Sequence, residues 1–139
     1  AEILETTSTE EGYNNFIIQG KAQEALYESY IRSLSSQSVT EVMLGDVRTV
    51  FHNVSVMFVS ELGHVLADHF GVAVLYSYDS RSKEFAIGLR GNGTIDVSEL
   101  ASKYFRGGGH HNASGGRCSV ADMVTFLSNG SEAKLPRKN

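Results

Sequence analysis

The segment 105–117 reads FRGGGHHNASGGR, and five of its thirteen residues are glycine. A glycine in an ordered element costs roughly 0.5–1 kcal/mol relative to alanine, so this density needs a compensating reason, and the usual one is close approach of the backbone to a ligand. Consecutive unobstructed N–H groups can bind an anion, and a histidine beside them can add a donor or a charge. The alternative is a flexible glycine-rich turn with an exposed histidine, and the residues alone leave both interpretations open.

Composition limits the class of protein. A chain of 139 residues, 41% hydrophobic and 20% charged, is the size and composition of one globular domain. The single cysteine, Cys118, excludes an internal disulfide and is typical of a reducing compartment. No apolar run approaches the roughly 18 residues of a membrane span, and the acidic N-terminus lacks the basic region of a signal peptide. We therefore expect a cytoplasmic protein with no membrane partner.

The pattern of apolar residues predicts alternating strands and short helices. Runs rich in β-branched and apolar residues predict strands at 39–44, 46–51, 54–59, 72–78 and 84–90. Helical spacing and capping residues predict helices at 21–34, 61–70, 97–105 and 121–127. Gly45 and the pair His52–Asn53 are expected at turns, and the segment 79–83 should join a hairpin.

This interleaving predicts an α/β fold: a single domain with a mixed β-sheet flanked by short helices and a glycine-rich loop between two helices. We expect a flexible N-terminal segment over 1–12, a folded domain over 13–130 and a flexible C-terminal tail over 131–139.

The glycine segment also carries a family resemblance. GGGHHNASGG (107–116), preceded by FAIGLRG (85–91) and IDVSELASKYF (95–105), resembles the C-terminal DHH-associated domain of the DHH phosphoesterase superfamily. That superfamily includes RecJ-like nucleases, oligoribonucleases that also dephosphorylate phosphoadenosine phosphate, and exopolyphosphatase-like proteins. The resemblance extends over about 39–127, and it implies that 13–130 is a substrate-binding domain.

In such proteins an N-terminal DHH domain holds two divalent metals, usually manganese, and the associated domain binds the phosphate or nucleotide of the substrate. The resemblance therefore implies that substrate binding falls to Arg90, Gly107, Gly108, Gly109 and His110. It implies no catalytic residue, metal ligand or cofactor in this chain, and manganese in the parent protein. The expected partners are a phosphorylated nucleotide, a short oligonucleotide or polyphosphate, together with the parent's DHH domain.

The chain departs from the family pattern in three places. It has no DHH triplet, and the nearest string, Asp68-His69-Phe70, lies on a predicted helix. Gly91 stands where family members often carry serine, and Arg106 directly precedes the glycines. We therefore expect the parent protein to hydrolyse phosphodiester or phosphoanhydride bonds, and this chain alone to be inactive.

The alternative function is a non-catalytic module for nucleic-acid binding or dimerisation, like the C-terminal domain of alanyl-tRNA synthetase. His110 after the glycines favours the phosphoesterase. The net charge of −4 disfavours a large RNA-binding surface, because such surfaces rely on many contacts from lysine and arginine to phosphates.

Overall fold

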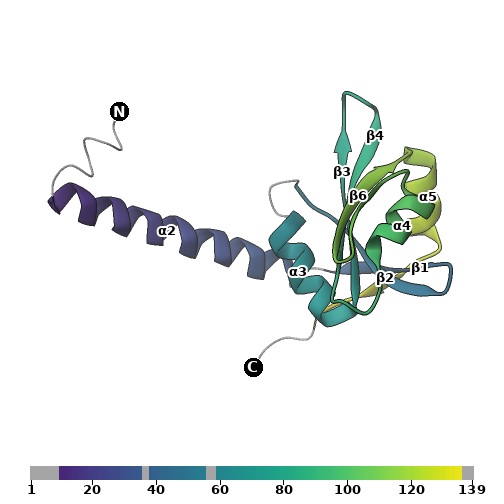
Figure 1. The fold of residues 1–139 in the computed structure, drawn as a ribbon, viewed down its shortest axis with the longest axis horizontal. Coiled ribbons are helices and arrows are strands. Elements are labelled where there is room, and N and C mark those ends of the chain that lie inside the picture. The colour runs from purple at the N-terminus through teal and green to yellow at the C-terminus, as the bar shows by residue number, and fades with distance from the viewer. Residues whose placement is uncertain (1–9, 36–37, 56–58, 136–139) are drawn as a thin grey trace. The chain divides into compact units, whose positions relative to one another are not determined.

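The computed structural model describes residues 10–35, 38–55 and 59–135, and the chain divides into two compact units, 1–34 and 35–139 (Figure 1). The described part of the first unit lies in helix α2 (Glu10–Ser35). This helix begins well before the predicted start at residue 21. Residues 1–9 and 136–139, the outer parts of the expected terminal segments, lie outside the described residues.

The second unit is built on a seven-stranded sheet in the order β5-β6-β4-β3-β2-β1-β7. The strands are β1 (Val39–Leu44), β2 (Val47–Asn53), β3 (Val72–Asp79), β4 (Glu84–Gly91), β5 (Gly108–His110), β6 (Ala113–Cys118) and β7 (Ser131–Ala133). Strands β2 and β3 pair in parallel, and the other neighbouring pairs are antiparallel. The predicted α/β fold with a mixed sheet is confirmed.

Three helices cover the two faces of this sheet: α3 (Val59–Phe70), α4 (Val97–Tyr104) and α5 (Val120–Ser128). Figure 1 shows α3 on one side and α4 and α5 on the other. The Asp96 side chain caps α4 by accepting a hydrogen bond from the Ser98 N–H, and the Ser119 side chain caps α5 in the same way with Asp122. Gly71, at φ +96°, provides the left-handed residue that ends α3.

The larger core lies between the sheet and helices α4 and α5. Phe51 from β2 packs on Phe105 and Phe126, with ring centroids 6.3 and 5.6 Å apart. Because side chains alternate along a strand, the neighbours of each core residue point toward α3. His52 follows the core residue Phe51, and Arg90 follows the core residue Leu89. The side chains of His52 and Arg90 therefore lie on the side of the sheet that faces α3.

Two predicted boundaries are wrong. His52 and Asn53 are not turn residues, because β2 continues through Asn53 to pair with Tyr76 of β3. The strand expected over 54–59 is not formed at its described positions. Val54 and Ser55 lie outside the strands, Val59 begins α3, and 56–58 lie outside the described residues. A parallel β2–β3 pair requires a crossover, and α3 provides it.

The ends of the sheet show two features that the sequence did not indicate. Strand β7 lies within the segment expected as a tail, and it pairs with β1. The glycine-rich segment lies between α4 and α5 as predicted, but its residues form the hairpin β5–β6. Among the helices of the described ranges, none is both long and apolar enough to cross a membrane.

Candidate functional site

Arg90, the penultimate residue of β4, carries a half-buried guanidinium on the α3-facing side of the sheet. Its Nη1 donates to the carbonyl oxygens of Leu89 at 2.8 Å and Ser114 at 3.5 Å. Burial lowers the pKa of this guanidinium, because desolvation disfavours the charged form. Within the described residues no carboxylate lies at ion-pair distance from Arg90, whereas Arg48 and Arg117 each have one. The charge of Arg90 is therefore partly desolvated, and none of the described carboxylates neutralises it.

Glycines make room for this arginine. A Cβ at Gly63 of α3 would come within 2.5 Å of the Arg90 Cγ, and one at Gly88 of β4 would come within 2.6 Å of the Val59 side chain. Helix α3 can therefore approach β4 closely while the stem of Arg90 runs between them. A larger residue at position 63 would press on the Arg90 stem and on the Leu75 side chain.

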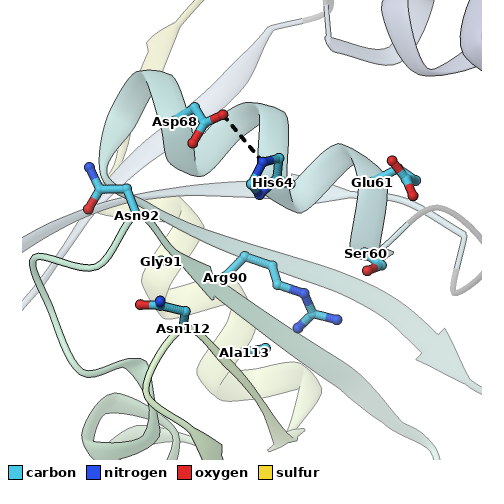
Figure 2. A pocket seen from close by; sticks show the side chains of 9 residues that line it. All are labelled: Ser60, Glu61, His64, Asp68, Arg90, Gly91, Asn92, Asn112 and Ala113. Carbon is cyan, nitrogen blue, oxygen red and sulfur yellow. Dashed lines mark ion pairs between the residues drawn. The ribbon is translucent and has the colours of Figure 1, made fainter.

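Two cavities meet at Arg90 and Ser60. The first, of about 470 Å³, is lined by Ser60, Glu61, His64, Asp68, Arg90, Gly91, Asn92, Asn112 and Ala113 (Figure 2). The second, of about 360 Å³, is lined by Val59, Ser60, Ser77, Ala86, Ile87, Gly88, Arg90, Ser114 and Gly115. Both are within the range of small-ligand sites. The first presents mainly polar and charged groups, and the second is more apolar.

The turn between β5 and β6 forms one wall of the first cavity. The Gly91 N–H donates to the Asn112 carbonyl at 3.0 Å, and the Val97 N–H donates to the His111 carbonyl at 2.9 Å. The Nε2 atom of the His111 ring lies 3.1 Å from the Gly93 carbonyl oxygen. These contacts hold the turn against the segment that follows β4, and they place Asn112 beside the cavity.

Helix α3 forms the opposite wall. His64 and Asp68 are one helical turn apart, and the His64 Nε2 lies 3.5 Å from the Asp68 Oδ2 (Figure 2). Glu61 and Ser60, from the first turn of the helix, complete this wall. Leu62 and Leu66 are buried, whereas Glu61, His64 and Asp68 lie on the exposed face of the helix and border the cavity.

Of the residues implied by the family resemblance, Arg90 alone lines these cavities. Gly107 and Gly109 pack on β6: a Cβ at Gly107 would overlap the Gly115 carbonyl oxygen, and one at Gly109 would lie 2.7 Å from the Ser114 Cα. A Cβ at Gly108 would meet no atom within 4 Å. His110 is exposed at the end of β5. Substrate binding by these four residues stays a prediction.

Sequence reasoning did not select the other polar residues of the first cavity, which are Ser60, Glu61, His64, Asp68, Asn92 and Asn112. One signal was present: Glu61, His64 and Asp68 are spaced three and four residues apart, which places them on one face of a helix. What the spacing could not show is that this face borders the end of β4.

Residues 10–35, 38–55 and 59–135 contain no group of three or more His, Cys, Asp or Glu side chains that could hold an ion. The resemblance implies manganese in the DHH domain of the parent protein, and that expectation stays a prediction. Cys118 is buried, and desolvation raises the pKa of its thiol to about 11, with a smaller contribution from Asp122.

No protein-family model and no curated protein matches the sequence. Solved structures do match it. An uncharacterized protein from Helicobacter pylori G27 is 25% identical, with a TM-score of 0.51, over 64% of this chain and 28% of that one. A pGpG-specific phosphodiesterase from Vibrio cholerae is 14% identical, with a TM-score of 0.48, over 76% of this chain and 36% of its own.

An exopolyphosphatase-related protein from Bacteroides fragilis is 17% identical, with a TM-score of 0.49, over 70% of this chain and 32% of its own. The chain thus spans 28%, 36% and 32% of the lengths of these three structures. Solved structures similar to this chain thus include proteins named as a pGpG-specific phosphodiesterase and as exopolyphosphatase-related.

Proposed function

We propose that this chain is the substrate-binding C-terminal domain of a DHH-type phosphoesterase, and that Arg90 binds a phosphate group of the substrate. The observation that carries the proposal is the state of Arg90. Its guanidinium is half-buried beside two cavities, donates to backbone carbonyls, and has no carboxylate partner among the described residues. A planar guanidinium binds phosphate oxygens with two parallel hydrogen bonds, and this geometry suits an anion that enters either cavity.

The partly desolvated charge of Arg90 supports an anionic group at this residue. Because burial disfavours the charged guanidinium, an anion beside it would recover part of the lost solvation free energy. The first turn of α3 borders the same cavity through Ser60 and Glu61. The N-terminus of a twelve-residue helix carries a partial positive charge, which adds to the attraction.

We include the glycine segment in the proposal as a second contact. Strand β5 is at the edge of the sheet, and an edge strand leaves some backbone N–H groups without a partner in the sheet. Gly108 has open space around its Cα, so a phosphate could approach the backbone there, with His110 as a further donor. Gly107 and Gly109 would serve this contact indirectly, by letting β5 pack on β6.

The role of this chain would be binding and orientation. The substrate would be a phosphorylated nucleotide, a short oligonucleotide or a polyphosphate, and its phosphate charge would be neutralised by Arg90. Hydrolysis of a phosphodiester or phosphoanhydride bond would belong to the parent protein, whose N-terminal DHH domain would hold the manganese and act in the cytoplasm. No described residue group of this chain offers that metal site.

Calorimetric titration of the 139-residue chain with phosphoadenosine phosphate tests the proposal. Hydrogen bonds to charged groups contribute about 1.5–3 kcal/mol, so Arg90→Gln should weaken binding by roughly 10- to 150-fold. Arg48→Gln is the matched control, because Arg48 pairs with Glu41 and lines neither cavity. Equal affinities of wild type and a folded Arg90→Gln variant would contradict the proposal.

A further inference from the structure

The first cavity contains two carboxylates as well as a cation. Glu61 and Asp68 line it together with Arg90, and His64 lies between the two acidic residues along α3. The side chains of His64 and Asp68 are 76% and 64% exposed, so this wall is open to a ligand. With two negative charges and one positive charge, the lining carries −1 when the imidazole is neutral and 0 when it is protonated.

This charge balance disfavours a chain of phosphates. Inorganic polyphosphate carries negative charge on every unit, so a ligand with one phosphate at Arg90 would bring the next phosphates toward Glu61 or Asp68. Like charges brought together at a binding surface oppose binding and discriminate between ligands. The cavity therefore suits a ligand whose second part is uncharged.

The same side chains suit hydroxyl groups. An ionised carboxylate only accepts hydrogen bonds, and an asparagine amide both donates and accepts. Asn92 and Asn112 line the same cavity as these α3 side chains (Figure 2). In a neutral imidazole, an Nε2–H directed at Asp68 leaves Nδ1 as an acceptor, so His64 would offer a further acceptor for a hydroxyl proton.

Resting on the proposed function of Arg90, we infer that Glu61, His64 and Asp68 determine specificity: they favour a phosphate ester of a sugar over inorganic polyphosphate. Arg90 binds the phosphate group, the α3 side chains accept hydrogen bonds from the sugar hydroxyls, and their negative charge repels additional phosphates.

Two probes with opposite expected responses test this inference on the full chain: ribose 5-phosphate and tripolyphosphate, each titrated calorimetrically. The amide oxygen of asparagine still accepts a hydrogen bond but lacks the charge of a carboxylate, so the weaker hydrogen bond to a hydroxyl should make Asp68→Asn bind ribose 5-phosphate about threefold to tenfold more weakly. Removal of an exposed charge should make the same variant bind tripolyphosphate about twofold to fivefold more tightly. A general structural defect would weaken both probes, so the opposite signs exclude it.

Further variants complete the test. Glu61→Gln should change the affinities for the two probes in the same directions as Asp68→Asn does. His64→Gln should weaken the binding of ribose 5-phosphate. Asp46→Asn and His69→Gln are matched controls, because both residues are exposed and line neither cavity. The inference would be overturned if Asp68→Asn and Glu61→Gln changed the affinities for the two probes in the same direction, or did not change them.

The Arg90→Gln variant tests the proposed function by itself, and it should weaken the binding of both probes. If Arg90→Gln changes neither affinity, the phosphate site itself is wrong. If it weakens both while Asp68→Asn and Glu61→Gln fail to separate them, only the assignment of specificity to α3 is overturned.

Discussion

Replacement of His52 by leucine should stabilise the domain and remove part of its sensitivity to acid. His52 is on β2, an interior strand, and its side chain is 7% exposed. Within the described residues its Nε2 has no hydrogen-bond partner. Desolvation lowers the pKa of the imidazole below its ordinary 6.5, so burial in the folded chain favours the neutral form. Leucine is close to histidine in size and has no polar atom to desolvate.

The magnitude has two parts. A buried polar atom without a partner costs about 1–3 kcal/mol, so His52→Leu should raise the free energy of unfolding by up to that amount at neutral pH. The pH-dependent part follows from proton linkage. Because the pKa is lower in the folded chain, the unfolded chain binds more protons at this histidine as pH falls through 6.5, so unfolding takes up protons and stability falls with pH. For one proton the slope is at most about 1.4 kcal/mol per pH unit, between 6.5 and the lowered folded pKa.

Urea unfolding followed by far-ultraviolet circular dichroism measures both parts, since the chain has no tryptophan for fluorescence. The free energy of unfolding is compared between wild type and His52→Leu from about pH 7.5 down to about pH 5.5. The difference between the two proteins should widen as pH falls, whereas His69→Gln, at an exposed histidine, should follow the wild type. Parallel curves for wild type and His52→Leu would refute the reasoning.

Two more substitutions and one chemical probe test other parts of the structure. Gly108→Val should leave the stability of the domain unchanged and weaken binding of phosphoadenosine phosphate, because its Cβ meets no protein atom but would occupy the proposed approach to β5. Gly109→Val should instead lower the free energy of unfolding by about 1–3 kcal/mol, because its φ is +150° and its Cβ would press on Ser114; equal unfolding curves would contradict this. Iodoacetamide at about pH 8 should modify Cys118 only after unfolding, because the buried thiol stays protonated below its pKa of about 11; rapid labelling of the native chain, measured by mass spectrometry, would show that the site opens.

The local elements were predictable because their signals are local. The capping residues Asp96 and Ser119 start α4 and α5, and the turn 79–83 joins β3 to β4 as expected. The predictions failed at positions whose secondary structure depends on pairing with a strand that is distant in the sequence. Asn53 stays in β2 because Tyr76 is its partner in β3, and residues 131–133 become a strand because β1 has a free edge. Nothing in the sequence near these positions shows those partners.

The candidate site was predictable only in part for the same reason. The family resemblance predicts Arg90 as a binding residue. The structure shows that Gly63 leaves space for the stem of this arginine below α3. Glu61, His64 and Asp68 show a helical spacing in the sequence, but a polar face of a helix is normally solvated. They become cavity residues because the β2–α3–β3 crossover brings α3 across the end of β4, next to the turn that contains Asn112.

The glycine segment shows how one sequence signal can have two physical causes. Its density predicts close approach of the backbone to a ligand, yet in the structure much of the close approach is made by the chain itself. Gly107 meets the Gly115 carbonyl, Gly109 meets Ser114, and Gly116 meets Phe105, so these three positions exclude side chains for packing reasons. Gly108 is the member of the triplet at which packing imposes no such limit. A requirement for glycine at position 108 in ligand binding would therefore be evidence for a backbone contact with the ligand, whereas a requirement at 107 or 109 would be expected from the hairpin alone.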